Sequence, residues 1–187
     1  KVKCNDKKHR FQPQVIRNYV KRIVTLAEAL NVEALYPLNS LNYEVLTGVK
    51  KDISSIRIDK QYRLEFKIST TDSEPIITIC SIIDITNIIN KNSMSNLGYS
   101  FIPVHPGEII KEELQSRGIS QKRFAEVVGV SYTMLNDILN GRRPVSTDFA
   151  LLIEAATNIN AEMLMNMQTR YNMQIARKDK NVIAHLE

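Results

Sequence analysis

The chain has 187 residues, 43% of them hydrophobic, which is enough for one large core or two small ones. No apolar run approaches the roughly 20 residues that span a bilayer and no signal peptide opens the chain, so we expect a cytoplasmic protein without a transmembrane helix. The net charge of +5 comes from the first half, which has 15 Lys+Arg against 10 Asp+Glu up to position 93, and a basic excess favours polyanionic partners such as nucleic acid.

Residues 11–30 predict a helix, and the sequence after them predicts a sheet. Apolar residues recur at helical spacing from Val15 to Leu26, and the opposite side carries three basic residues, Arg17, Lys21 and Arg22. Four segments rich in β-branched residues follow, separated by short polar turns, at 41–46, 53–58, 62–68 and 75–83. One helix followed by a meander of strands predicts a small α+β domain.

The segment 90–100 is polar and turn-forming, and beyond it the strand pattern ends. Pro106 and Gly118 mark the expected start and end of a helix. Further helices are predicted at 120–128, 131–140, 146–157 and 161–177. We therefore predict two domains of different class, an α+β domain at 1–90 and an all-α domain of about five helices at 101–187, with a linker at 91–100.

Nothing in the sequence indicates a metal, a cofactor or a disulfide. Cys4 and Cys80 lie far apart, which favours reduced thiols in a cytosolic protein. The sequence has no clustered Cys/His ligand set, no glycine-rich phosphate loop and no nucleophile motif. We therefore expect no cofactor and no metal site.

A twenty-residue helix-turn-helix fits the sequence when Gln121 is taken as its first position. The fifth position must be small because the two helices cross there, and it is Ala125; the ninth needs a positive φ, and it is Gly129. Leu135 and Ile138 stand at the two positions that pack the second helix onto the first. Any helical hairpin needs a glycine turn and apolar faces, but the combined spacing favours DNA binding.

In such a motif the start of the second helix enters the major groove. The best candidates for base contacts are Tyr132, Thr133 and Asn136, and Asn136 can bond adenine with both ends of its amide. Asp137 either accepts from cytosine or is simply solvated. Ser131 is expected to cap the second helix. Contacts to phosphates are expected from four further residues, Gln121, Arg123, Arg142 and Arg143.

A single domain of this size binds DNA weakly, so we expect a homodimer that reads two half-sites. The last helix is rich in apolar residues and is either a dimer surface or part of the core. Its candidate residues are Met163, Leu164, Met167 and Met173.

Three stretches of the second half, HPGEIIKEEL, SQKRFAEVVGVSYTMLNDILNGRRPVS and FALLIEAA, closely resemble HigA-type antitoxins over roughly residues 101–178. These are helix-turn-helix repressors of host-inhibition toxin–antitoxin systems, which act in plasmid maintenance as addiction modules. The resemblance implies a protein that represses its own operon as a dimer and neutralises a partner toxin.

The first half carries LTGVKKDISSIRIDKQYRLEF, which resembles the HigB/RelE toxins over about residues 7–85. These relatives are ribosome-dependent mRNA interferases, so the resemblance implies an endoribonuclease whose partners are the ribosome and mRNA. RNA cleavage by the 2′-OH needs proton transfer and positive charge near the phosphate. By similarity, Arg57 and Arg63 are the phosphate ligands and Lys50 or Lys51 transfers a proton. Tyr62 either stacks on a base or packs in the interior.

Two departures from the toxin pattern leave alternatives open. Relatives often supply a histidine at the end of the last strand, but here that stretch is Ser81–Ile82–Ile83, and the histidines are His9, His105 and His185. Relatives also begin with a strand and a helix for which this sequence has little room. The chain is then either a toxin and an antitoxin joined together, with Met94 where a separate antitoxin would start, or a DNA-binding regulator whose first half is a catalytically inactive interaction domain.

Overall fold

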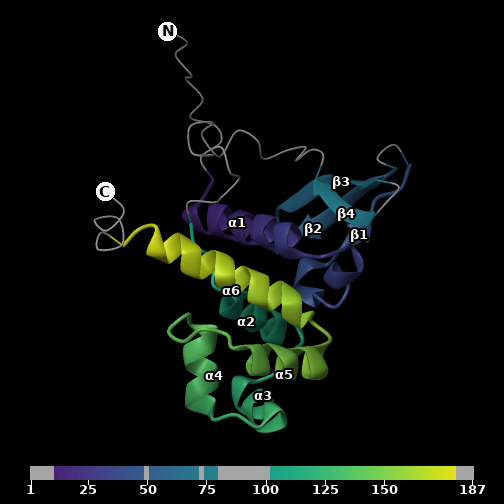
Figure 1. Cartoon of the computed structure of the whole chain (residues 1–187). Coiled ribbons are helices and arrows are strands. Elements are labelled where there is room, and N and C mark those ends of the chain that lie inside the picture. Colours follow the sequence, from purple (N-terminus) through teal and green to yellow (C-terminus); the bar gives the residue numbers. More distant parts are fainter. Residues whose placement is uncertain (1–10, 49–50, 72–73, 80–101, 180–187) are drawn as a thin grey trace.

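The computed structural model describes residues 11–48, 51–71, 74–79 and 102–179. The first half contains α1 (Pro13–Glu28), two short 3-10 helices, η1 (Glu33–Leu35) and η2 (Asn39–Leu41), and a four-stranded sheet in the order β1-β2-β3-β4. The strands are β1 (Glu44–Val45), β2 (Ile53–Arg57), β3 (Arg63–Thr71) and β4 (Glu74–Ile79), and each pairs antiparallel with the next. The predicted helix and meander are confirmed, and both lie at one end of the molecule (Figure 1).

Two strand boundaries differ from the prediction. The predicted strand at 41–46 shrinks to two residues because Asn39–Leu41 form a 3-10 helix that buries Leu41 completely. The predicted turn at 69–74 is mostly strand, since β3 continues to Thr71 and pairs there with Glu74 across a register shift. An apolar residue thus enters the core by a helical turn, and the register between β3 and β4 shifts between Ser69 and Thr71.

The sheet has a core face and an outer face because side chains alternate along a strand. The core face includes Ile56, Leu64 and Phe66, each 0–1% exposed, and these residues share a hydrophobic cluster with Tyr19 and Leu26 of α1. Tyr62, at the turn before β3, packs its ring edge-to-face on Phe11 at a centroid distance of 5.3 Å and stays 37% exposed.

The second half is all-α, as predicted. Its helices are α2 (Pro106–Ser116), α3 (Gln121–Val128), α4 (Tyr132–Leu139), α5 (Thr147–Thr157) and α6 (Ala161–Ala176). Four helices begin at side chains that accept a hydrogen bond from a backbone N–H of the first turn, which satisfies a donor that would otherwise lack a partner: Ser120, Ser131, Ser146 and Asn160. In the described part of the chain, no helix is both long and apolar enough to cross a membrane.

The helix α6 connects the two halves, because it packs against α5 and α2 on one side and against α1 on the other. Figure 1 shows α6 and α2 in the middle of the molecule, between the first half, where α1 lies beside the sheet, and the α3–α4 pair. Three residues proposed for either a dimer surface or the core, Met163, Leu164 and Met167, are 0% exposed and therefore belong to the core. Met173 is 49% exposed. The division into domains at 1–90 and 101–187 stays a prediction.

Candidate nucleic-acid interface

The crossing of α3 and α4 has the geometry that the residue spacing predicted. Ala125 is 2% exposed, and Leu135 and Ile138 are 0% exposed. Gly129 ends α3 with φ +71°, a left-handed conformation in which a side chain would be strained. Ser131 then caps α4 by accepting from the backbone N–H of Met134 at 3.1 Å. The helix-turn-helix prediction is confirmed in each of these positions.

The outer side of α4 carries polar side chains at the surface. Tyr132 is 52% exposed, Thr133 is exposed, and Asn136 is half-buried. Asp137 forms an ion pair of 3.6 Å with Arg142. Because one face of α4 lies in the core, this outer face is held in a fixed orientation.

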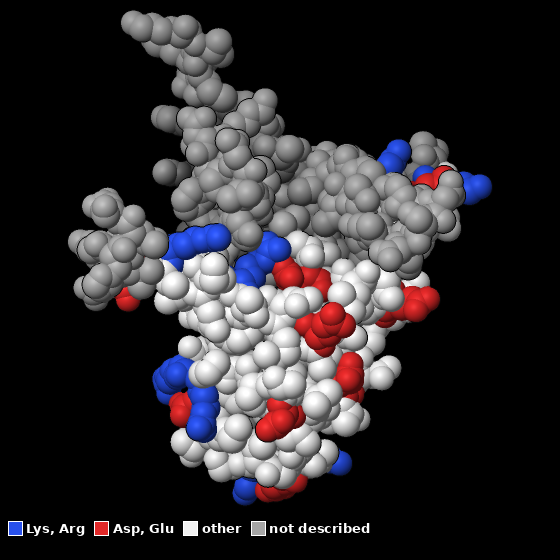
Figure 2. Space-filling model, viewed as in Figure 1, with Lys and Arg blue, Asp and Glu red and all other residues white. Residues whose placement is uncertain are grey.

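Basic side chains surround this outer face. Arg142 and Arg143, just after α4, are exposed, as is Arg123 near the start of α3. Figure 2 shows Lys and Arg side chains beside α4 and again near α3, with Asp and Glu side chains also present on the same face. A protein surface of this kind can bind phosphates on either side of a helix that reads base edges.

A chain of hydrogen bonds crosses the end of α4. Lys111 of α2 donates through Nζ to Asn140 Oδ1 at 2.8 Å. Asn140 Nδ2 donates to the backbone oxygen of Asn136 at 2.8 Å and to its Oδ1 at 3.1 Å. Asn136 Nδ2 donates to Gln121 Oε1 at 3.2 Å. Two predicted DNA-contacting residues, Gln121 and Asn136, are therefore bonded to each other.

The start of α2 packs tightly against α4. His105 caps α2 through Nδ1, which accepts from the backbone N–H of Gly107 at 3.0 Å, and its ring meets Tyr171 edge-to-face at 4.9 Å. Burial lowers the pKa of His105, although the nearby Glu108 opposes that shift. A neutral ring fits this role, because a protonated Nδ1 could not accept. A Cβ at Gly107 would lie well inside contact distance of the Ile138 carbonyl.

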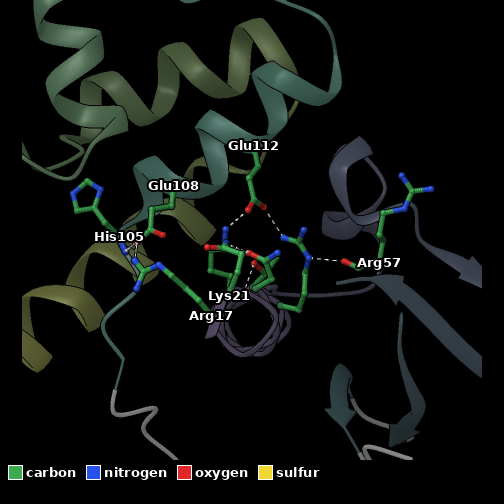
Figure 3. A network of polar contacts seen from close by, with 10 residues as sticks. Arg17, Lys21, Arg57, His105, Glu108 and Glu112 are labelled. Atoms are coloured by element: carbon green, nitrogen blue, oxygen red, sulfur yellow. Dashed lines mark hydrogen bonds and ion pairs between the residues drawn. The ribbon is translucent and has the colours of Figure 1, made fainter. Parts of the chain in front are cut away.

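Ion pairs join α1 to α2, and we call this group the clasp: Arg17, Lys21, Arg22, Glu108 and Glu112 (Figure 3). Arg17 bonds Glu108 at 2.7 Å, and Glu112 receives both Lys21 and Arg22, the latter at 2.7 Å. The Lys21 and Arg22 side chains are only 7% and 5% exposed. Burial alone would raise the pKa of Glu112, but the charges and hydrogen bonds of Arg22 and Lys21 outweigh it and hold that pKa below its ordinary value.

The next residue of α2 fixes the start of η2. Glu113, 1% exposed, accepts from the backbone N–H groups of Asn39 at 2.7 Å and Ser40 at 3.0 Å. Arg117 donates to Glu113 at 3.0 Å and also to the carbonyl of Pro37. The α2 helix therefore binds the first half both through side-chain charges and through backbone groups.

Two of the candidate catalytic residues, Arg57 and Arg63, lie on the outer face of the sheet. Arg57 and Arg63 stand directly opposite each other in the β2–β3 register. Arg63 bonds Ser55 at 2.7 Å and pairs with Glu44 at 2.7 Å. Arg57 is exposed, and its guanidinium points away from the clasp while its backbone carbonyl accepts from Arg22 at 2.6 Å (Figure 3). Lys51 is exposed in the turn before β2.

Several predicted features lie outside the described residues: Lys50, Cys4, Cys80, His9, His185, Met94, the 81–83 segment and the linker at 91–100. Among the residues that are described, no group of three or more His, Cys, Asp or Glu side chains is placed to hold a metal ion. Three features were not predicted from the sequence: the clasp, the His105 cap and the hydrogen-bond chain from Lys111 to Asn136. Only HPGE had a signal for the cap, since Glu108 stands three residues after His105 as in a capping box.

Known proteins are similar to part of this chain. The fold defines a helix-turn-helix protein, and the helix-turn-helix family matches residues 110–164. Virulence-associated protein I of Dichelobacter nodosus is 36% identical over 81 residues, which are 43% of this chain and 75% of that protein. Virulence-associated protein A' of the same organism is 35% identical, over 38% of this chain and 63% of its own length. The chain therefore belongs to the family of virulence-associated protein I, and its residues 110–164 match the helix-turn-helix family.

Solved structures include similar chains. Antitoxin HigA of Pseudomonas aeruginosa, solved with the higBA promoter, is 34% identical and covers 40% of this chain and 83% of its own, with a TM-score of 0.39. An addiction module antidote protein of the HigA family from Coxiella burnetii is 30% identical and covers 46% of this chain and 94% of its own, with a TM-score of 0.42.

Proposed function

We propose that this chain is an antitoxin-like transcriptional regulator whose helix-turn-helix domain binds operator DNA. The observation that supports this most is the outer face of α4, where Tyr132, Thr133 and Asn136 stand at the surface of a helix whose other face is core. Such a face presents hydrogen-bonding groups with little freedom to move. Recognition of base edges requires groups held in this way, because each base pair is identified by the positions of its donors and acceptors. The match of residues 110–164 to the helix-turn-helix family agrees with this function.

The roles of the other residues follow from the docking of such domains on DNA. Arg142, Arg143 and Arg123 neutralise phosphates, and Ser131 and Asp137 lie at the edge of the groove. Because one domain contacts few base pairs, the protein acts as a homodimer on two half-sites about one helical turn apart.

The test is recovery of a duplex from a random pool, followed by gel-shift titration. We expect Thr133→Ala/Asn136→Ala to weaken specific binding by about 1–3 kcal/mol for each lost base contact. The matched control is Asn166→Ala/Thr169→Ala, which changes the same residue types on α6 and should leave binding unchanged. Equal affinity of both double variants would contradict the recognition-helix assignment, and recovery of no sequence at all would contradict the function.

We propose as a second function that residues 1–90 form a HigB-like toxin part, held by the clasp to the antitoxin-like part at 101–187. The observation that favours it is the pair Arg57 and Arg63. Like charges directly opposite in a sheet repel each other, and the ion pair of Arg63 with Glu44 offsets part of that repulsion. An anionic ligand such as an RNA phosphate would offset it further.

We expect residues 1–93 to arrest growth when they are expressed alone. We also expect the purified fragment to cleave mRNA in a ribosome-dependent reaction. Arg57→Ala/Arg63→Ala should abolish both effects. The control Lys60→Ala/Lys67→Ala removes two exposed cations, one between β2 and β3 and one in β3, and should leave cleavage in place. A folded fragment that neither arrests growth nor cleaves mRNA would instead support the alternative function, a regulator with a catalytically inactive interaction domain.

A further inference from the structure

We propose that Lys111 and Asn140 are positioning residues that fix the orientation of the Asn136 amide and thereby set which base it reads. The inference rests on the proposed binding of operator DNA. It concerns two residues that need not touch a base themselves: Lys111 lies on α2, and Asn140 follows the last residue of α4.

The direction of the hydrogen bonds is set at the Lys111 end. An ammonium group can only donate, so the atom of Asn140 that faces it at 2.8 Å must be the oxygen. The amide nitrogen of Asn140 then faces the backbone carbonyl of Asn136, which can only accept. Two partners of opposite kind therefore hold the Asn140 amide in one of its two orientations.

Asn140 in turn orients Asn136. The nitrogen of Asn140 lies 3.1 Å from the Asn136 side chain, so that side chain must turn its oxygen toward Asn140. Its nitrogen then faces Gln121 Oε1 at 3.2 Å. Each atom of the Asn136 amide keeps half of its capacity, namely one N–H on one side and one oxygen lone pair on the other.

This remaining pair is what the major-groove edge of adenine needs. Adenine presents the N7 acceptor beside the N6 donor, and an asparagine amide bonds both when its nitrogen and oxygen lie on the matching sides. Reversing the amide would place its nitrogen, a donor, against the N6 donor of adenine and its oxygen, an acceptor, against the N7 acceptor. The orientation that Lys111 and Asn140 impose is therefore a determinant of base preference at one position of each half-site.

The experiment uses the full chain and the duplex recovered from the random pool. Asn136→Ala first identifies the base pair whose preference depends on Asn136. At that base pair, Lys111→Met and Asn140→Ala should each reduce discrimination between the preferred base and the other three by roughly fivefold or more. Preferences at the other positions should stay unchanged. Lys111→Arg, which also only donates, should retain full discrimination.

The salt dependence of binding separates positioning from direct contact with phosphate. We expect the slope of log affinity against log salt to be the same for Lys111→Met and the parent chain. Arg123→Met serves as the contrast, because Arg123 is an exposed cation of α3 assigned to a phosphate. Loss of a phosphate contact lowers affinity for all sequences alike and reduces the slope by about 1.

The outcomes distinguish this inference from the function on which it rests. Absence of sequence-specific binding by the parent chain would overturn the proposed function. Specific binding with unchanged base preference in both Lys111→Met and Asn140→Ala would overturn the positioning roles and leave the function in place. A uniform loss of affinity with a reduced salt slope in Lys111→Met would show a phosphate contact and would also overturn them.

Discussion

Substitution of Glu112 by glutamine should lower the free energy of unfolding, because Glu112 lies in the contact between the two halves of the protein. The Glu112 carboxylate is 21% exposed and balances two nearly buried cations, Lys21 at 7% and Arg22 at 5%. Removing one partner of such a buried group costs about 3–5 kcal/mol, because the remaining charges have lost their solvation and their counter-charge. Glutamine keeps the volume and one acceptor, so we expect about 3 kcal/mol, the lower end of that range.

The free energy of unfolding of the whole chain in urea, followed by circular dichroism, measures this loss. Glu126→Gln is the control, since Glu126 is exposed on α3, and it should change stability by no more than about 0.5 kcal/mol. Lys21→Met combined with Glu112→Gln should cost at least about 1 kcal/mol less than the sum of the single variants. Additive losses, or a Glu112 variant as stable as the Glu126 control, would refute the view that the clasp stabilises the molecule.

The pH dependence of this loss has a definite sign. The pKa of Glu112 is lowered in the folded protein, so the folded state favours the charged carboxylate. Its contribution is therefore complete above the ordinary pKa of about 4.5 and is lost as the pH falls through the lowered value. The difference in stability between the parent and Glu112→Gln should shrink over that acid range. A difference that stays constant down to the acid limit of folding would contradict the charge-based explanation.

Two further substitutions test the packing of α2. Gly107→Ala should destabilise the fold by roughly 1–3 kcal/mol or more, because its Cβ would collide with the Ile138 carbonyl. In the control Gly129→Ala the new Cβ meets no atom within 4 Å, so the cost should be only about 1 kcal/mol, for the left-handed backbone. Equal urea midpoints for the two variants would contradict the close approach of Gly107 to Ile138. His105→Asn keeps an acceptor at the cap and removes the titrating ring. Burial lowers the pKa of His105 despite the nearby Glu108, so below about pH 6.5 the unfolded chain binds a proton more readily than the folded one, and the parent should lose stability relative to this variant. Parallel pH profiles of the two proteins would contradict the lowered pKa.

The helix-turn-helix could be predicted from the sequence because each of its demands falls on one residue at a fixed spacing. A left-handed turn requires something close to glycine, as at Gly129, and a close helix crossing requires a small residue, as at Ala125. Caps such as Ser131 are equally local. These constraints act over a few residues, so they are visible in a single sequence without knowledge of the rest of the fold.

The polar contacts of the candidate site could not be predicted because they depend on residues far apart in the chain. Lys111 and Asn140 are 29 positions apart, and nothing in either neighbourhood indicates a bond between them. The His105 cap was also missed, since histidine is an unusual capping residue and the expected acceptors are Ser, Thr, Asp and Asn. Strand ends were the least accurate part, because the 3-10 helix that ends at Leu41 uses the same apolar residues as a strand would.

The clasp shows a more general limit of hydrophobic periodicity. The pattern along α1 sets Arg17, Lys21 and Arg22 apart from the apolar residues, although Arg22 donates to the carbonyl of Arg57 in β2 and so faces the sheet. It assigns the charged side to water by default, but Lys21 and Arg22 are buried there against the carboxylate of Glu112. A charged face suits water and an oppositely charged partner equally well, so composition cannot tell the two apart. Each side of this contact is ordinary by itself: a basic helix in the first half, and in the second half the acidic residues Glu108, Glu112 and Glu113. Only their complementarity identifies them as a contact, and a single sequence does not show which charged segments face each other.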